Sequence, residues 1–244
     1  NKTVPLLMFS VFALASCQSS PDKTAVSKTP VIKAPDVSAP IEPPIANLDA
    51  NIQIRKEQFI VETAKKYALS EVYVRDTLAK AEYKQNIVNA MSRPAEATKT
   101  WAQYRPIFIT DSRISQGSVF LSDNSASLQR VSNEYGVPAE IIVSIMGVET
   151  GWGGNMGSYN VLVALYTLAF FYSVINAKPN PTRASFFSAE LSQFFALCKE
   201  EDFDILSVKG SYAGAMGLGQ FMPSSYRKYA KDGDGDGKRN LFTS

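Results

Sequence analysis

The sequence predicts a mainly α-helical fold, and three observations lead to it. Apolar residues recur at helical spacing in residues 59–67 and again in residues 72–88, which is typical of helices with one buried face. A third helical pattern covers residues 138–149. The roughly 190 residues from 51 to 244 are enough for one hydrophobic core with a packed helical subdomain.

The first residues predict an exported protein. Lys2 precedes an apolar run over residues 4–15, which is shorter than the roughly 18 apolar residues that a membrane-spanning helix needs. We interpret residues 1–16 as a signal peptide. Because no initiator Met is present, we expect further residues before Asn1.

The sequence Leu14-Ala-Ser-Cys17 is similar to a bacterial lipobox. Cleavage before Cys17 would leave that cysteine carrying lipid. The next residues, Gln18 and Ser19, lack the Asp that retains similar lipoproteins at the inner membrane. We therefore expect an outer-membrane anchor facing the periplasm. An uncleaved signal with Cys17 as an unmodified thiol is the alternative.

Residues 17–50 are predicted to comprise the lipidated cysteine and an extended tether. Their composition turns to Pro, Ser, Lys, Ala and Asp, and prolines interrupt the segment repeatedly: Pro21, Pro30, Pro35, Pro40, Pro43 and Pro44. A chain of this composition cannot bury a core. We expect the folded domain to begin near Asn51, at the end of a tether that lets it work at a distance from the membrane.

One acidic residue, Glu149, occupies a position where a carboxylate has little structural reason to be. A helix is predicted to begin at Pro138, with Glu140 beside its positive end, and to stop at the glycines after Glu149. Helical steps back from Glu149 reach only apolar residues: Met146, Ile145 and Ile142. Desolvation there would raise the pKa of the carboxyl group and keep it able to donate a proton near neutral pH. A buried Glu satisfied by an Arg or by backbone amides is the structural alternative.

A second segment, residues 209–226, combines closely spaced glycines with polar and aromatic side chains. Gly214, Gly217 and Gly219 are too close together for a helix interior, where each would cost about 1 kcal/mol relative to alanine. Close packing or the approach of a ligand is the better explanation. The alternative is a glycine-rich turn that leads into a helix near Pro223.

Together, the two segments resemble the membrane-bound lytic murein transglycosylase B family. The resemblance rests on Gly-Val-Glu149-Thr-Gly-Trp-Gly and on Gly-Ser211-Tyr-Ala-Gly-Ala-Met-Gly-Leu-Gly-Gln220-Phe-Met-Pro-Ser-Ser-Tyr, and it extends from about Trp101 to the end of the chain. It implies a mainly α fold of the α+β class, with a minor non-helical part, in which a lysozyme-like core carries an additional helical subdomain. It also implies an enzyme that cleaves the MurNAc–GlcNAc β-1,4 bond of peptidoglycan without adding water, leaving 1,6-anhydro-MurNAc ends, for cell-wall turnover and remodelling.

The resemblance also implies roles for individual residues. Glu149 matches the single catalytic acid of the family. Other residues match positions that line the glycan groove: Tyr104, Ser211, Gln220 and Phe221. Further groove residues of the family would lie beyond Ser244, so we expect the catalytic domain to be truncated at its C-terminus.

The sequence departs from the family pattern around Arg183. The family usually has two adjacent arginines and a Tyr, whereas this chain has Thr182, Arg183 and Phe186, preceded by a longer stretch over residues 172–181. Arg183 therefore matches one of the two arginines. We expect the loop that carries it to have a conformation different from that of the family. A surface arginine with no role in binding is the alternative.

A single candidate carboxylate limits the mechanism. Ordinary glycosidases use two carboxylates, but substrate-assisted enzymes use the N-acetyl carbonyl of the substrate as the nucleophile. Glu149 would first protonate the leaving oxygen and then act as base toward the C6 hydroxyl, which attacks the anomeric carbon in place of water. An apolar groove would serve this scheme by excluding water. By resemblance, Ser211 would orient the acetamido group, and catalysis would need no cofactor.

Residues 232–237 fit the first half of an EF-hand-like calcium loop. Carboxylates stand at alternate positions: Asp232, Asp234 and Asp236. Gly237 lies where such a loop turns sharply, and the carbonyl of Lys238 would be the next ligand. The twelfth position is Thr243, which cannot supply the usual bidentate carboxylate. In the family that the chain resembles, a late carboxylate follows beyond the point where this sequence stops. We expect a structural Ca²⁺ ion, with a solvated acidic turn as the alternative.

Composition excludes several function classes. The formal net charge is +2 and histidine is absent. So small a charge, with no basic run interleaved with aromatic residues, does not indicate nucleic-acid binding. The absence of histidine excludes His-based triads and His metal sites, and it favours carboxylate chemistry. After lipidation of Cys17 only Cys198 would remain, which we expect to be a small core residue that forms no disulfide.

Two other functions stay open at this point. A non-catalytic peptidoglycan-binding lipoprotein would keep the groove and lose the acid, and the presence of Glu149 argues against it. A hydrolytic muramidase would share the acid but should supply a second carboxylate or a positioned water, and distant Asp or Glu residues could converge to do so. The expected partners are peptidoglycan glycan strands and, through a lipid anchor, the outer membrane, with cell-wall synthesis or remodelling proteins as further candidates.

Overall fold

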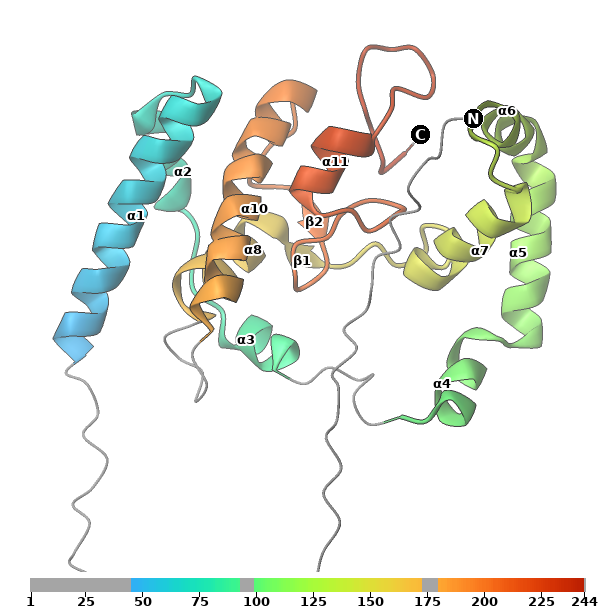
Figure 1. The fold of residues 1–244 in the computed structure, drawn as a ribbon, viewed down its shortest axis with the longest axis horizontal. Coiled ribbons are helices and arrows are strands. Elements are labelled where there is room, and N and C mark those ends of the chain that lie inside the picture. Colours follow the sequence, from blue (N-terminus) through green and yellow to red (C-terminus); the bar gives the residue numbers. More distant parts are fainter. Residues whose placement is uncertain (1–44, 93–98, 173–179, 244) are drawn as a thin grey trace, which may run out of the picture. The chain divides into compact units, whose positions relative to one another are not determined.

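The computed structural model describes residues 45–92, 99–172 and 180–243 (Figure 1). The predicted mainly α-helical fold is confirmed. The helices are α1 (Ile45–Tyr67), α2 (Glu71–Leu78), α3 (Gln85–Met91), α4 (Trp101–Phe108), α5 (Asp111–Asp123), α6 (Ser125–Tyr135), α7 (Ala139–Thr150), α8 (Val161–Phe170), α10 (Pro181–Glu201) and α11 (Pro223–Tyr229). The strands β1 (Tyr159–Asn160) and β2 (Lys209–Gly210) form a short antiparallel sheet.

The first described helix starts earlier than expected. Helix α1 begins at Ile45, whereas the folded part was expected to begin near Asn51. The physical reason is local, because Pro44 is the last proline of the segment and proline is tolerated just before or at the start of a helix. The predicted signal peptide, Cys17 and the tether up to residue 44 lie outside the described residues. Among the described helices, none combines the length and the apolar composition that crossing a membrane requires.

Helix α8 is the centre of the hydrophobic core. It has no charged residue, and nine of its ten residues are buried, as expected for a helix surrounded by other elements. Helix α10 packs along it, and helices α1 and α3 contact it as well. The ring of Phe59 in α1 lies 5.7 Å from that of Phe170 and 6.0 Å from that of Phe195. Val61, part of the predicted apolar pattern, is instead 46% exposed.

Cys198 is buried in α10, in agreement with its predicted place in the core. Burial raises the pKa of its thiol, which makes the thiolate scarce and the residue unreactive. Helix α7 packs against α5 and α6 in another part of the described chain. The connection from α7 to α8 and the segment from β2 to α11 carry the two sequence motifs.

Candidate active site

Helix α7 carries Glu149 in its last turn. The helix starts after Pro138 and ends at Gly151, whose φ of 58° is left-handed. Such a conformation is common for the glycine that follows a helix. The predicted helix and its stop at the glycines are therefore confirmed, with Pro138 as the residue just before the first turn.

Glu149 points away from the buried side of α7. That side is formed by Val143, Gly147 and Thr150, whereas Glu149 belongs to the exposed residues. Its neighbour one turn back, Ile145, is 54% exposed. The predicted apolar stripe is present, with Ile142 and Met146 half-buried and Ile145 exposed in the described chain.

The carboxyl group of Glu149 is nevertheless perturbed. Desolvation by the surrounding protein raises its pKa, although the side chain remains accessible. Within the described residues, no arginine, lysine or backbone amide bonds to its carboxylate, so the alternative of a structurally satisfied Glu finds no support there. A raised pKa extends the protonated, proton-donating form to higher pH.

The indole of Trp152 folds back beneath α7. Trp152 has a left-handed φ of 56°, and its Nε1 donates a hydrogen bond to the carbonyl of Val143 at 2.9 Å. The ring lies against two glycines, because a Cβ added to Gly147 or Gly117 would meet a ring atom at 2.5 or 2.9 Å. Phe120 of α5 stacks nearby at 6.4 Å between centroids. This packing fixes the end of α7 against α5 and leaves Glu149 on the outer side.

The hydroxyl of Thr150 connects the first motif to the second. Thr150 is 2% exposed. Its Oγ1 lies 3.1 Å from the carbonyl oxygen of Leu218, to which it donates, and accepts a hydrogen bond from the amide of Gly153 at 3.0 Å. The residue beside the predicted acid therefore contacts the glycine-rich segment directly.

Two further contacts join the same segments. Gln220 donates from Nε2 to the carbonyl of Met156 at 3.2 Å. In the second contact, Tyr159 of β1 pairs with Gly210 of β2 in the antiparallel sheet. The two motifs, which are separated by many residues in the sequence, lie against one another in the fold.

Ser211 holds a tight turn and keeps a free donor. Its Oγ accepts hydrogen bonds from the amides of Ala213 at 3.3 Å and Ala215 at 3.1 Å. A serine hydroxyl has one proton in addition to its lone pairs. Within the described residues that proton has no acceptor, so it can be donated to a ligand.

The four other predicted glycan-binding residues lie in different parts of the described chain. Gln220 and Phe221 are half-buried, and Gln220 has a left-handed φ of 49°. Tyr104 lies in α4, with its ring 5.0 Å from that of Phe108. Arg183 lies in the first turn of α10 and donates to Met91 Sδ at 3.2 Å. No described hydrogen bond or ring contact links Tyr104 or Arg183 to the two motif segments.

The guanidinium of Arg183 is incompletely satisfied. Its Nε is buried and has no hydrogen-bond partner among the described residues, while the group lies 5.8 Å from the centre of the Phe187 ring. The residue as a whole is half-buried, and its role in binding the glycan stays a prediction.

A cavity of 310 Å³ between α4, α5 and α7 lies on the other side of α7 from Glu149. Its walls include Arg113, Val143 and Trp152, and none of the predicted site residues. The residues that α7 contributes lie roughly 100° to 180° around the helix from Glu149, at 3.6 residues per turn. Glu149 itself does not line this cavity.

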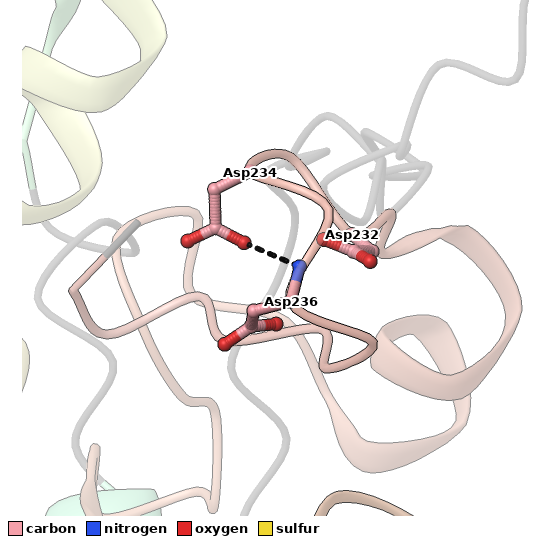
Figure 2. Close-up of side chains that lie close together, drawn as sticks. All are labelled: Asp232, Asp234 and Asp236. Carbon is pink, nitrogen blue, oxygen red and sulfur yellow. Dashed lines mark hydrogen bonds between the residues drawn. The ribbon is translucent and has the colours of Figure 1, made fainter.

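The acidic loop brings its three carboxylates together. Oxygen atoms of Asp232, Asp234 and Asp236 lie within 4.8 Å of one another, and all three residues are exposed (Figure 2). Asp232 accepts hydrogen bonds from the amides of Gly237 at 2.9 Å and Gly235 at 2.7 Å, and these bonds lower the pKa of its carboxyl group. Clustered, ionised oxygen donors of this kind fit a hard cation such as Ca²⁺.

The described chain is mainly helical and has Glu149, whose pKa is raised, at a helix end beside a glycine-rich segment with a hydroxyl donor. Its fold is of the lysozyme-like class, as in a solved muramidase/transglycosylase that is 41% identical with a TM-score of 0.69. The family model described as Transglycosylase SLT domain matches residues 52–244, and the chain belongs to this family. The resemblance seen in the two motifs is thereby confirmed.

Three known proteins define the similarity further. The membrane-bound lytic murein transglycosylase B of Escherichia coli (strain K12) is 40% identical over 195 residues, which make up 76% of this chain and 52% of that protein. The crystal structure of soluble lytic transglycosylase SltB1 from Pseudomonas aeruginosa has 49% identity and a TM-score of 0.71, covering 78% of this chain and 61% of that one. The Escherichia coli lytic transglycosylase Slt35 in complex with calcium has 41% identity and a TM-score of 0.69, covering 77% and 57%.

The chain thus spans about half the length of the curated relative that it matches. The similar proteins are all described as lytic transglycosylases, one of them membrane-bound and one soluble. One of them has been observed with calcium.

Three residues of the site could not be predicted from patterns: Thr150, Trp152 and Leu218. Their roles depend on contacts between distant parts of the chain. One signal was present for Thr150, since a hydroxyl directly after a helical acid and before a glycine is well placed to bond to backbone groups.

Proposed function

We propose that this protein is a lytic transglycosylase that cleaves the MurNAc–GlcNAc β-1,4 bond of peptidoglycan and leaves 1,6-anhydro-MurNAc ends, in cell-wall turnover and remodelling. One observation carries the proposal. Glu149 has a raised pKa and no cationic partner among the described residues, and it stands where the two motif segments meet. Membership of the Transglycosylase SLT domain family supports the same activity.

The proposed reaction uses Glu149 twice. Its protonated carboxyl donates a proton to the glycosidic oxygen as the bond from that oxygen to C1 of MurNAc breaks. The N-acetyl carbonyl of the substrate stabilises C1, and the free proton of Ser211 Oγ–H is available to orient that carbonyl. The carboxylate of Glu149 then takes the proton of the C6 hydroxyl while O6 bonds to C1. No water is consumed.

The buried carboxylates of the described chain favour this single-acid scheme over hydrolysis. Glu190 accepts from the amide and hydroxyl of Ser224 at 2.9 and 2.6 Å. Glu201 accepts from the amide and Nε of Arg239 at 2.7 and 2.6 Å. Both groups are occupied in holding elements together, so neither serves as a second catalytic carboxylate.

The glycan-binding residues belong to the same proposal. Tyr104, Gln220 and Phe221 would contact the sugars, and Arg183, which is half-buried, would donate to the glycan strand from the accessible part of its guanidinium. A non-catalytic peptidoglycan-binding protein would use the same residues, so binding alone does not separate these two functions.

We also propose a structural Ca²⁺ ion held by the carboxylates of Asp232, Asp234 and Asp236 and by the carbonyl of Lys238. The clustered oxygen donors support it, and so does the calcium complex of Slt35. The ion would stabilise the loop and takes no part in the proposed reaction.

We further propose that Cys17 carries lipid and anchors the protein to the outer membrane, facing the periplasm. The lipobox-like sequence supports it, as does the description of one relative as membrane-bound. Mass spectrometry of the mature protein purified from membranes would detect the added acyl chains, and a Cys17→Ser variant should appear in the soluble periplasmic fraction. A membrane-bound Cys17→Ser variant would contradict the anchor.

The products test the reaction class. Purified sacculi digested with the enzyme should release muropeptides with 1,6-anhydro-MurNAc ends, lighter by one water than the products of a lysozyme, as measured by mass spectrometry. Reducing MurNAc ends as the main product would identify a hydrolytic muramidase instead. Binding to sacculi without any released product would identify a non-catalytic binding protein.

A further inference from the structure

Thr150 follows the proposed acid in the sequence but points in a different direction. Successive residues of an α-helix are about 100° apart around its axis, since there are 3.6 residues per turn. Glu149 lies on the outer side of α7, while Thr150 is turned inward and is 2% exposed. Any rotation of this last turn would move both side chains together.

The hydroxyl of Thr150 is engaged both as a donor and as an acceptor. It accepts from the amide of Gly153 at 3.0 Å, and its single proton has two carbonyl acceptors within reach, Leu218 at 3.1 Å and Met146 at 3.3 Å. The bond to Met146 stays within α7, whereas the bond to Leu218 reaches the glycine-rich segment. In the described chain, no other side-chain hydrogen bond joins α7 itself to residues 210–221.

Leu218 is a firm point of attachment. Its amide donates to the carbonyl of Leu241 at 2.8 Å, and its side chain fills the space beside Gly153, where an added Cβ would lie 2.9 Å from Leu218 Cδ2. Gly217 on the preceding side is packed against Leu241, because a Cβ there would lie 2.6 Å from the Leu241 carbonyl oxygen. The acceptor of the Thr150 hydroxyl is therefore held from both sides.

We propose that Thr150 is a positioning residue for the cleavage reaction. Its hydroxyl fixes the rotation of the last turn of α7 relative to residues 211–221 and so holds the Glu149 carboxyl at the correct place for the bound glycan. This inference rests on the proposed function of Glu149. A displacement of about 1 Å at a reacting group can lower a rate by about 10²-fold, so a single buried hydroxyl at this junction is sufficient for a large effect on turnover.

The test compares variants of the full-length protein for kcat and KM on purified sacculi and for thermal stability. Thr150→Val keeps the shape and removes the hydroxyl, and we expect it to lower kcat at least ~10-fold with KM within about twofold, the pattern of a lost transition-state interaction. Thr150→Ser keeps the hydroxyl and should restore kcat to within about threefold of wild type.

A matched control separates positioning from stability. Thr167 in α8 is also fully buried, and its Oγ1 accepts from the amide of Lys84 at 3.2 Å. Thr167→Val should therefore lower the melting temperature, as is also expected of Thr150→Val, and leave kcat of the folded enzyme unchanged. Should Thr150→Val fail to fold, Thr150→Cys takes its place, because it keeps an atom at the γ position but donates and accepts only weakly, and the same fall in kcat is expected.

Each outcome decides one question. Wild-type kcat in Thr150→Val or Thr150→Cys, or an equal loss of kcat in Thr167→Val, would overturn the positioning role. Glu149→Gln, measured in parallel, tests the proposed function separately: if it remains active, the acid has been assigned wrongly, whatever Thr150 does. If Glu149→Gln is inactive while Thr150→Val is fully active, only the positioning role fails.

Discussion

The turn that follows α7 and the loop that follows α11 are built from similar residues but are stabilised differently. Both are short and glycine-rich, and both use a left-handed glycine, Gly151 with φ of 58° in the first and Gly237 with φ of 86° in the second. In the first, buried groups bond across elements: Thr150 to Leu218, and the indole of Trp152 to Val143.

In the acidic loop, the carboxylates bond mainly to amides of the loop itself. Asp232 accepts from Gly235 and Gly237, and Asp234 accepts from the amide of Asp236 at 3.3 Å (Figure 2). Three negative charges remain close together and exposed. Like charges repel, so the loop has an electrostatic cost that a bound cation would offset.

The turn after α7 and the loop after α11 therefore hold their acidic groups in two different ways. The turn after α7 is fixed by protein contacts alone, so it can present one carboxyl in a defined place without a ligand. The loop after α11 leaves its carboxylates arranged around a common point, as expected of ligands for an ion. We therefore expect the first region to respond to changes in packing and hydrogen bonding, and the second to respond to calcium.

The largest expected effect is on Glu149. Glu149→Gln is nearly isosteric but cannot exchange a proton, so kcat should fall at least ~10²-fold while binding to sacculi is retained. Glu140→Gln, at the other end of the same helix, is the control and should stay within a few-fold of wild type. Turnover is measured by release of muropeptides, and binding by co-sedimentation with sacculi. Activity of Glu149→Gln close to wild type would remove the acid from the mechanism.

The pH dependence of cleavage should reflect the raised pKa of Glu149. A general acid acts in its protonated form, which is present below its pKa and lost as the pH rises through it. Because desolvation raises this pKa, kcat/KM should begin to fall only above the ordinary pKa of an exposed Glu, about 4.3. Rates measured across pH at constant ionic strength locate the descending limb of this pH profile. A limb at or below that value would contradict a desolvated acid.

Much of the α7 region could be predicted because its signals are local. Apolar spacing and the following glycines define the helix and its end, and the same local reading predicts the burial of Cys198 in α10. The start of α1 at Ile45 was missed because a proline-rich composition was extended past its last proline.

The contacts of the site could not be predicted because they join distant residues. The bond from Thr150 to Leu218 spans 68 positions. The fold-back of Trp152 needs a left-handed φ that only a few per cent of non-glycine residues adopt, so no pattern indicates it. The exposure of Ile145 depends on which elements cover α7, and helical periodicity carries no information about that.

A smaller effect, on the free energy of unfolding, should distinguish the packing at the end of α7 from that of the acidic loop. Gly147→Ala places a Cβ 2.5 Å from the ring of Trp152, and overpacking of this kind typically costs about 1–3 kcal/mol. Gly233 in the acidic loop has an ordinary φ and open space around it, so Gly233→Ala should leave the free energy of unfolding nearly unchanged. Denaturant titration of both variants measures the difference. Equal stabilities would show that the indole does not hold the end of α7.

The smallest expected effect is that of calcium on stability. An ion that binds only the folded state stabilises it by RT ln(1 + [Ca²⁺]/Kd), which is about 1.4 kcal/mol at ten times Kd, or about 3–6 °C in melting temperature for a domain of this size. Millimolar Ca²⁺ should produce this shift in the full-length protein, because it relieves the repulsion among the three carboxylates of residues 232–236. Asp234→Ala should abolish the shift, whereas Asp76→Ala, an exposed acid on α2, should retain it. An unchanged melting temperature in wild type would leave the segment as a solvated acidic turn, and loss of cleavage in chelator without loss of fold would assign the ion a role in the reaction.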